Sequence, residues 1–143
     1  LGPRGAIAGI LADTPDSIVG TYGWQQLPVG TAVYLSEMRR AKVAIACRGG
    51  GWDTMRLWEA AGSGCAVVVE KPPFPVDDWF TARMVCEFTS PEECAAHVRR
   101  LLADPAERQE RAERTYAHFL SAAITPVTAN AHATACVCVP NGT

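Results

Sequence analysis

The chain has 143 residues, of which 48% are hydrophobic and 20% charged, and its thirteen basic and fifteen acidic side chains give a net charge of −2. This is the composition of one globular domain, because disordered chains have fewer apolar residues and a higher net charge. We expect no nucleic-acid partner, since the chain has no basic excess, and no membrane span, since no apolar run approaches the roughly 18 residues that one needs. The chain begins at Leu1 without a signal segment, so we expect a soluble piece of a longer protein.

The first half of the chain alternates amphipathic helices with short apolar strands, which is typical of an α/β domain with a parallel sheet. The pattern predicts a helix over residues 3–12, a short strand over 17–22, a loop over 23–28 and a second helix over 31–40. The continuous apolar run over 43–47 predicts a strand that is covered on both faces, as at the centre of a parallel sheet.

A glycine-rich loop, residues 48–52, separates that strand from a helix expected over 53–61. The glycines after this helix are expected to end it, because glycine adopts the left-handed cap conformation at little cost. Further strands are expected over 65–69 and 84–88. Three prolines within residues 70–75 exclude a helix or a central strand there, because proline has no amide hydrogen to donate.

Two later helices have explicit starts, each with a capping residue, a proline and a glutamate: Ser90, Pro91 and Glu93, then Asp104, Pro105 and Glu107. The second carries Glu–Arg pairs at i,i+4, each worth about 0.2–0.5 kcal/mol. Its buried stripe is expected to be Ala112, Tyr116 and Phe119. The periodicity fades after residue 121, so we divide the chain into a domain over 1–121 and a divergent or poorly ordered tail over 122–143.

Six cysteines lie at positions 47, 65, 86, 94, 136 and 138. The first three fall in or beside apolar runs, where free cysteine behaves as a small hydrophobe, and we expect a reducing, cytoplasmic location. No C-x-x-C pair is present for zinc or redox chemistry. Cys136 and Cys138, with His132 nearby, leave metal binding as an alternative to an ill-ordered tail, but we expect no metal site.

The segment that joins the 43–47 strand to the next helix carries the candidate chemistry. Open α/β sheets bind ligands outside the carboxyl ends of their strands, where Arg48 and three glycines, Gly49, Gly50 and Gly51, lie. Glycines allow a ligand to approach the backbone closely, and the N-terminus of a helix attracts anions. An arginine side chain can donate two hydrogen bonds to phosphate oxygens. The loop is a candidate pyrophosphate cradle; the alternative is a tight turn with Asp53 as N-cap and Arg48 exposed.

Arg56 and Glu59 share a helix face with this loop. A carboxylate at Glu59 can accept hydrogen bonds from two ribose hydroxyls, and Arg56 can contact a phosphate; alternatively, the two form an i,i+3 ion pair on a surface helix. Trp52 and Trp58 are assigned to packing rather than to base stacking. A P-loop kinase and an ordinary dinucleotide dehydrogenase are disfavoured, because neither complete glycine-rich nucleotide motif is present.

Residues 49–60, GGGWDTMRLWEA, and residues 62–69, GSGCAVVV, resemble the donor-binding half of two-domain (GT-B) glycosyltransferases. They are most similar to the bacterial group 1 and spore-maturation (CgeB-like) enzymes, with some likeness to exostosin-type enzymes, over about residues 34–120. The resemblance implies a Rossmann-like parallel sheet flanked by helices, the C-terminal half of a GT-B architecture, that binds a nucleotide-diphosphate sugar.

In this resemblance Glu59 corresponds to the second glutamate of the family's E-x7-E motif, which binds the nucleotide ribose. Gly51 stands where the first glutamate is expected, which leaves the donor sugar undefined. The donor-binding residues that the resemblance implies are Arg48, Gly49, Gly50, Gly51, Asp53, Thr54, Arg56 and Glu59. No cofactor or protein-held metal is expected, because cations and a helix dipole can stabilise the departing diphosphate.

The acceptor site and any general base are expected in an N-terminal domain of the parent chain that is missing here, so no catalytic residue is named. Acidic residues of the proline-rich loop (Glu70, Asp77 and Asp78) are expected to be solvated, and His97 and His118 to be surface residues. We favour the donor domain of a glycosyltransferase. The alternatives are a non-catalytic Rossmann-like binding module and, less favoured, a nucleotide-binding domain of another enzyme such as a sugar epimerase.

Overall fold

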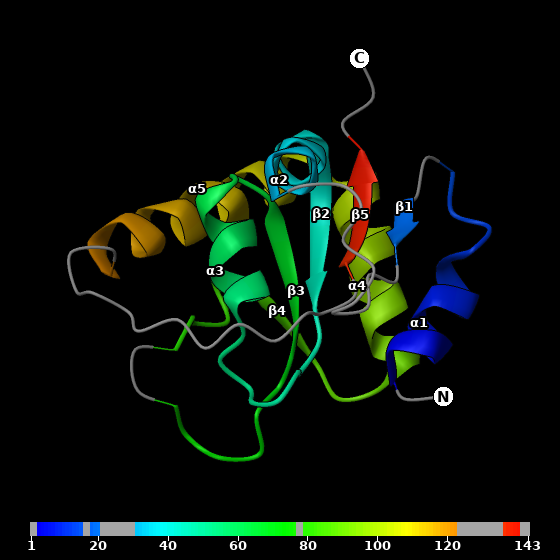
Figure 1. Ribbon diagram of the computed structural model, residues 1–143, viewed down its shortest axis with the longest axis horizontal. Coiled ribbons are helices and arrows are strands. Elements are labelled where there is room, and N and C mark those ends of the chain that lie inside the picture. The colour runs from blue at the N-terminus through cyan, green and yellow to red at the C-terminus, as the bar shows by residue number, and fades with distance from the viewer. Residues whose placement is uncertain (1–2, 16–17, 21–30, 77–78, 123–135, 141–143) are drawn as a thin grey trace.

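The computed structural model describes residues 3–15, 18–20, 31–76, 79–122 and 136–140, which form one mixed sheet with helices on both faces (Figure 1). The elements follow in the order α1 (Pro3–Leu11), β1 (Ile18–Gly20), α2 (Thr31–Arg40), β2 (Ala41–Ala46), α3 (Met55–Gly62), β3 (Ala66–Glu70), β4 (Cys86–Phe88), α4 (Pro91–Ala103), α5 (Pro105–Ala122) and β5 (Cys136–Pro140). None of these helices has the length and apolar character needed to cross a membrane.

The sheet has the strand order β1-β5-β2-β3-β4. Strands β2, β3 and β4 are parallel, with Val43 opposite Ala66 and Val69 opposite Glu87. The predicted α/β, Rossmann-like parallel sheet flanked by helices is therefore confirmed. Strand β5 is antiparallel to both of its neighbours. It comes from the segment expected to be a tail, of which residues 123–135 and 141–143 lie outside the described part.

Both faces of β2 and β3 are buried, as their continuous apolar runs predict. Side chains alternate along a strand, so Val43 and Ile45 pack with α1 and α4 on one face. Ala44 and Ala46, the residues between and after them, pack with α2 and α3 on the other face. The parallel strands are thus the centre of the domain, and their carboxyl ends are the edge at which the loops can form a site.

The two predicted helix caps are confirmed. Oγ of Ser90 accepts a hydrogen bond from the Glu93 amide at 3.2 Å, and Oδ1 of Asp104 accepts one from the Glu107 amide at 3.0 Å. The Glu93 carboxylate accepts from the amide of Thr89 at 2.7 Å. Each cap stabilises its helix by about 1 kcal/mol, which is why both helices begin where the sequence pattern predicts.

The start of α3 and the buried face of α5 differ from expectation. Helix α3 begins at Met55 with Thr54 as N-cap, so the N-cap is not Asp53, the residue that the tight-turn alternative assigned to it. On α5 the buried residues are Ala112 and Thr115, whereas Tyr116 is 42% exposed. The predicted stripe through Tyr116 is therefore wrong, because the Thr115 hydroxyl bonds to the Met84 and Arg111 carbonyls and turns that face inward.

Four cysteines, Cys47, Cys65, Cys86 and Cys94, are buried. Burial raises the pKa of Cys86 and of Cys94. The interpretation as buried, small hydrophobic residues is confirmed for Cys47, Cys65 and Cys86, the three cysteines of the apolar runs. Within the described ranges no three His, Cys, Asp or Glu side chains group as a metal site; His132 and the side chains of Cys136 and Cys138 are not among those described.

Candidate functional site

The loop after β2 is tied to the end of the neighbouring strand β3. The amide of Arg48 donates to Oε2 of Glu70 at 3.0 Å, and Nε of Arg48 lies 3.3 Å from Oε1 of the same carboxylate. Glu70 is the last residue of β3 and only 9% exposed. The expectation that Glu70 is solvated in a loop is therefore wrong: it fixes Arg48 at the carboxyl edge of the sheet.

The backbone of the loop after β2 forms hydrogen bonds with other groups of the protein. The Gly49 amide donates to the Gly51 carbonyl at 3.0 Å, and the side chain of Arg4 donates to the Arg48 carbonyl. The amides of Arg48 and Gly49 are thus engaged within the protein in this conformation. The anion-binding potential of the loop therefore comes from the Arg48 guanidinium, whose side chain is 53% exposed, and from the α3 N-terminus.

Asp53 and Thr54 connect the loop to α3. The N-cap Thr54 is extended, at φ −98 and ψ 143, and its side chain makes no capping hydrogen bond. Asp53 is exposed and accepts from Nε1 of Trp58. Trp58 packs on Phe80, with ring centroids 4.9 Å apart, so its assignment to packing is confirmed. His118 stacks on Trp58 at 6.0 Å and is only partly exposed, so it is not the simple surface residue expected.

Arg56 and Glu59 form a cluster with Tyr34 of α2. The Tyr34 hydroxyl donates to Oε2 of Glu59 at 2.8 Å, and Nε of Arg56 lies 4.0 Å from the same oxygen. The Arg56 guanidinium lies 4.6 Å from the centre of the Tyr34 ring. The Arg56 side chain is 8% exposed and that of Glu59 27%. The i,i+3 contact exists, but its arginine is buried rather than on a surface helix.

The sequence places Tyr34 within the helix predicted over residues 31–40 and indicates no role for it in the site. The signal that could have identified its role is chemical: a partly buried tyrosine needs a hydrogen-bond partner for its hydroxyl. That partner, Glu59, lies on another helix, 25 residues along the chain. The structure therefore adds Tyr34 to the candidate site, where it holds a Glu59 carboxylate that remains partly exposed.

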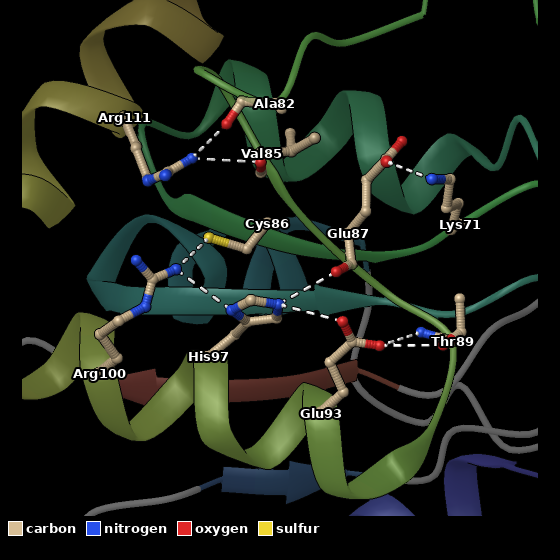
Figure 2. Close-up of a pocket in the computed structure, with 10 residues that line it drawn as sticks. All are labelled: Lys71, Ala82, Val85, Cys86, Glu87, Thr89, Glu93, His97, Arg100 and Arg111. Atoms are coloured by element: carbon tan, nitrogen blue, oxygen red, sulfur yellow. Dashed lines mark hydrogen bonds and ion pairs between the residues drawn. The ribbon is translucent and has the colours of Figure 1, made fainter.

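A separate cavity of about 330 Å³ lies along the outer edge of β4, against α4 and α5 (Figure 2). Its lining includes Lys71, Cys86, Glu87, His97, Arg100 and Arg111. Nε2 of His97 lies 3.1 Å from the Glu87 carbonyl, and Nδ1 lies 3.2 Å from Nη2 of Arg100. A carbonyl only accepts and an arginine only donates, so these contacts fit the neutral imidazole with its proton on Nε2. His97 is therefore not the simple surface residue expected.

The polar side chains around this cavity cap the free edge of β4. Arg111 donates to the Val85 carbonyl at 3.2 Å, His97 contacts the Glu87 carbonyl, and Glu93 accepts from the Thr89 amide (Figure 2). Edge strands expose backbone groups that invite pairing with another chain, and side chains that occupy those groups prevent it. These contacts give the cavity a structural explanation and separate it from the loop after β2.

A family model described as glycosyl transferase-like matches residues 5–128. The matched stretch is most of the chain and includes the candidate residues from Arg48 to Glu59. Neither the curated proteins nor the solved structures contain a match. The glycosyltransferase resemblance of the sequence is thus confirmed at the level of the family, while the GT-B and CgeB-like assignment stays a prediction. The chain belongs to the glycosyl transferase-like family.

Proposed function

We propose that this chain is the donor-binding part of a GT-B glycosyltransferase, similar to the CgeB-like enzymes, and that it binds a nucleotide-diphosphate sugar along the loop after β2 and helix α3. The observation that carries the proposal is the setting of Glu59. Its carboxylate is oriented by Tyr34 at 2.8 Å, yet 27% of its side chain is exposed. An ionised carboxylate is an acceptor with two oxygens, which suits the vicinal hydroxyls of a ribose.

The diphosphate would then lie between Arg48 and the start of α3. The ion pair of Arg48 with Glu70 uses Nε, and a guanidinium has further donors on its terminal nitrogens. The amides at the start of a helix and the helix dipole attract anions, and the Thr54 side chain makes no capping bond there. We include Gly49, Gly50, Gly51 and Asp53 in the proposed site as the backbone and flanking residues of this loop.

In the proposed reaction the bond between the anomeric carbon and the diphosphate oxygen breaks, and its electron pair stays on the diphosphate. The acceptor oxygen forms the new bond to the anomeric carbon and loses its proton to a base, which we assign to the acceptor-binding domain. Arg48 and the α3 N-terminus favour this step because they stabilise negative charge that develops on the leaving group. No cofactor or protein-held metal is part of the proposal.

A non-catalytic Rossmann-like binding module is the second candidate. Two observations favour it: the internal bonds of the Arg48 and Gly49 amides, and the glycine at position 51 in place of an acidic residue. The two candidates differ in turnover. The full-length protein would release nucleoside diphosphate from a bound donor if it is a transferase, and would bind without release if it is a binding module.

The proposed donor binding is tested by titrating the chain with UDP, GDP, CDP and dTDP and following thermal unfolding. A ligand present at 100 times its dissociation constant adds about 2.7 kcal/mol of stability. Glu59→Gln should remove this gain for the nucleotide that binds. Glu37→Gln is the matched control, because Glu37 also pairs with an arginine three residues away, at 3.1 Å, but lies on α2. A folded wild-type chain that none of the four nucleotides stabilises would contradict the proposal.

A further inference from the structure

Phe74 is a large, exposed apolar side chain in the proline-rich loop after β3. Its side chain lies between Pro73 and Pro75 in the segment after β3, and it is 53% exposed. The base of the loop is anchored, because Pro72 is buried and the Lys71 amide donates to the Phe88 carbonyl at 2.9 Å. Prolines restrict the backbone, so the exposed ring is preorganised rather than left on a loose segment.

Phe74 contacts the loop that follows the neighbouring strand. Its ring meets that of Trp52 edge-on, with centroids 6.4 Å apart and planes at 85°. The Arg48 guanidinium lies 5.3 Å from the centre of the Trp52 ring, and Glu70 holds Arg48 in place. The loops after β2 and β3, which leave the same edge of the sheet (Figure 1), are therefore joined by an aromatic pair next to a fixed cation.

Gly51, beside Trp52, borders open space. A Cβ at this position would meet no atom within 4 Å, and Gly51 does not have the positive φ that would require glycine. Neither packing nor backbone conformation explains the missing side chain. Close approach of a ligand to the backbone is the remaining physical use of a glycine at a loop edge, and the aromatic pair forms the adjacent wall of that space.

We infer that Phe74, supported by Trp52, forms the subsite for the transferred sugar, with the apolar face of a pyranose ring stacked on the aromatic patch beside Gly51. This inference rests on the proposed function. A nucleotide-diphosphate sugar has a fixed order of ribose, diphosphate and sugar. Glu59 lies four residues, or about 6 Å of helix rise, beyond the α3 start at Met55, so a donor with its ribose at Glu59 and its diphosphate at Met55 extends next toward Trp52.

The test compares the dissociation constants of UDP with UDP-glucose and of GDP with GDP-mannose, measured by calorimetry. In the wild type the sugar should tighten binding about fivefold, the value of one aromatic contact near 1 kcal/mol. Phe74→Ala should abolish this difference and leave the affinity for the bare nucleotide unchanged, while Phe74→Trp should retain it. Tyr116→Ala, which removes another exposed ring, 42% exposed on α5, is the matched control and should change neither constant.

The outcomes separate the two proposals. If the bare nucleotide binds and Phe74→Ala keeps the sugar-dependent gain, or if the wild type shows no such gain, the sugar subsite is wrong and the nucleotide site stands. If Phe74→Ala weakens the bare nucleotide as much as the nucleotide sugar, Phe74 contacts the nucleotide and the subsite is again wrong. If no nucleotide binds to the wild type, the proposed function itself fails.

Discussion

The hydroxyl of Tyr34 lies 2.8 Å from Oε2 of Glu59, and the same tyrosine ring lies over the guanidinium of Arg56 at 4.6 Å. One side chain of α2 therefore orients two side chains of α3. Because the hydroxyl donates, Glu59 remains an acceptor, and its other oxygen can meet a ligand. The bond also joins two helices that cover the same face of the sheet.

Tyr34→Phe removes this bond and keeps the ring over Arg56. We expect the free energy of unfolding to fall by about 1 kcal/mol, the usual net contribution of one hydrogen bond. The affinity for the nucleotide that binds should fall about fivefold, because the Glu59 carboxylate loses its orientation. Urea unfolding and calorimetric titration measure the two effects. Tyr116→Phe is the control, and equal nucleotide affinity in Tyr34→Phe and wild type would show that Tyr34 has only a structural role.

Gly51→Ala tests whether the glycine at position 51 is needed for ligand binding rather than for folding. The added Cβ meets nothing within 4 Å, so stability should be unchanged or should rise by about 0.4–1 kcal/mol through the unfolded chain. Nucleotide-sugar binding should weaken, because the methyl group enters the space beside Trp52. Thermal unfolding with and without ligand measures both quantities.

Gly62→Ala is the contrasting glycine variant. Its Cβ would lie 2.8 Å from the Phe119 ring, and such overpacking costs about 1–3 kcal/mol. It should therefore lower stability without a specific effect on binding at saturating ligand.

If Gly51→Ala binds the nucleotide sugar as well as the wild type does, the open space at Gly51 is not used by the donor.

Arg111 is expected to stabilise the free edge of β4. It donates to the Ala82 carbonyl at 2.8 Å and the Val85 carbonyl at 3.2 Å, and it pairs with Glu107 at 2.8 Å. Arg111→Ala removes the hydrogen-bond donor to these two carbonyls and the partner of Glu107. It should lower the free energy of unfolding, measured with urea, by about 2–3 kcal/mol. Arg114→Ala on the same helix removes only an exposed pair with Glu110 and should cost less than about 1 kcal/mol. Equal losses would show that the carbonyl contacts of Arg111 contribute little.

Glu93 should make stability depend on pH in the acid range. Hydrogen bonds from the amide and hydroxyl of Thr89 lower the pKa of the Glu93 carboxyl below its ordinary value of 4.5. A group with a lowered folded pKa stabilises the protein above its ordinary value, and this stabilisation is lost as the pH falls through the folded pKa.

Glu93→Gln removes that titration. It should be less stable than the wild type at neutral pH, and the difference should shrink as the pH is lowered below 4.5. Urea midpoints over a pH series measure the change, with Glu92→Gln, an exposed neighbour in the same helical turn, as the control. A difference from the wild type that is the same at every pH would rule out this role of the Glu93 carboxyl.

Local chemistry explains what could be predicted. Ser90 and Asp104 each accept a hydrogen bond from the amide three residues further along the chain. The apolar runs of β2 and β3 specify strands that are covered on both faces. These features need only neighbours along the chain and the general rule that parallel strands are buried. The region around Arg48 and Glu59 could be found for the same reason, since a loop after a buried strand is where such sheets bind ligands.

Contacts between distant segments could not be predicted. Glu70 was expected to be solvated because three prolines follow it closely, but parallel pairing brings it to Arg48. The inward face of α5 depends on the carbonyl of Met84, a residue outside the helix, which accepts a hydrogen bond from the Thr115 hydroxyl. Likewise, β5 joins β1 to β2 through pairings that no local pattern specifies.

The sequence by itself determined the α/β class, the order of the elements through α5, the helix caps and the stretch that carries the candidate chemistry, because each follows from periodicity, proline and glycine positions or short-range bonds. Only the tertiary structure decided that Arg48 is held by Glu70, that Tyr34 orients Glu59 and that Phe74 stands beside Trp52. The residues of each pair are 22 to 25 positions apart in the chain, and their geometry arises only when the helices and strands pack into one sheet.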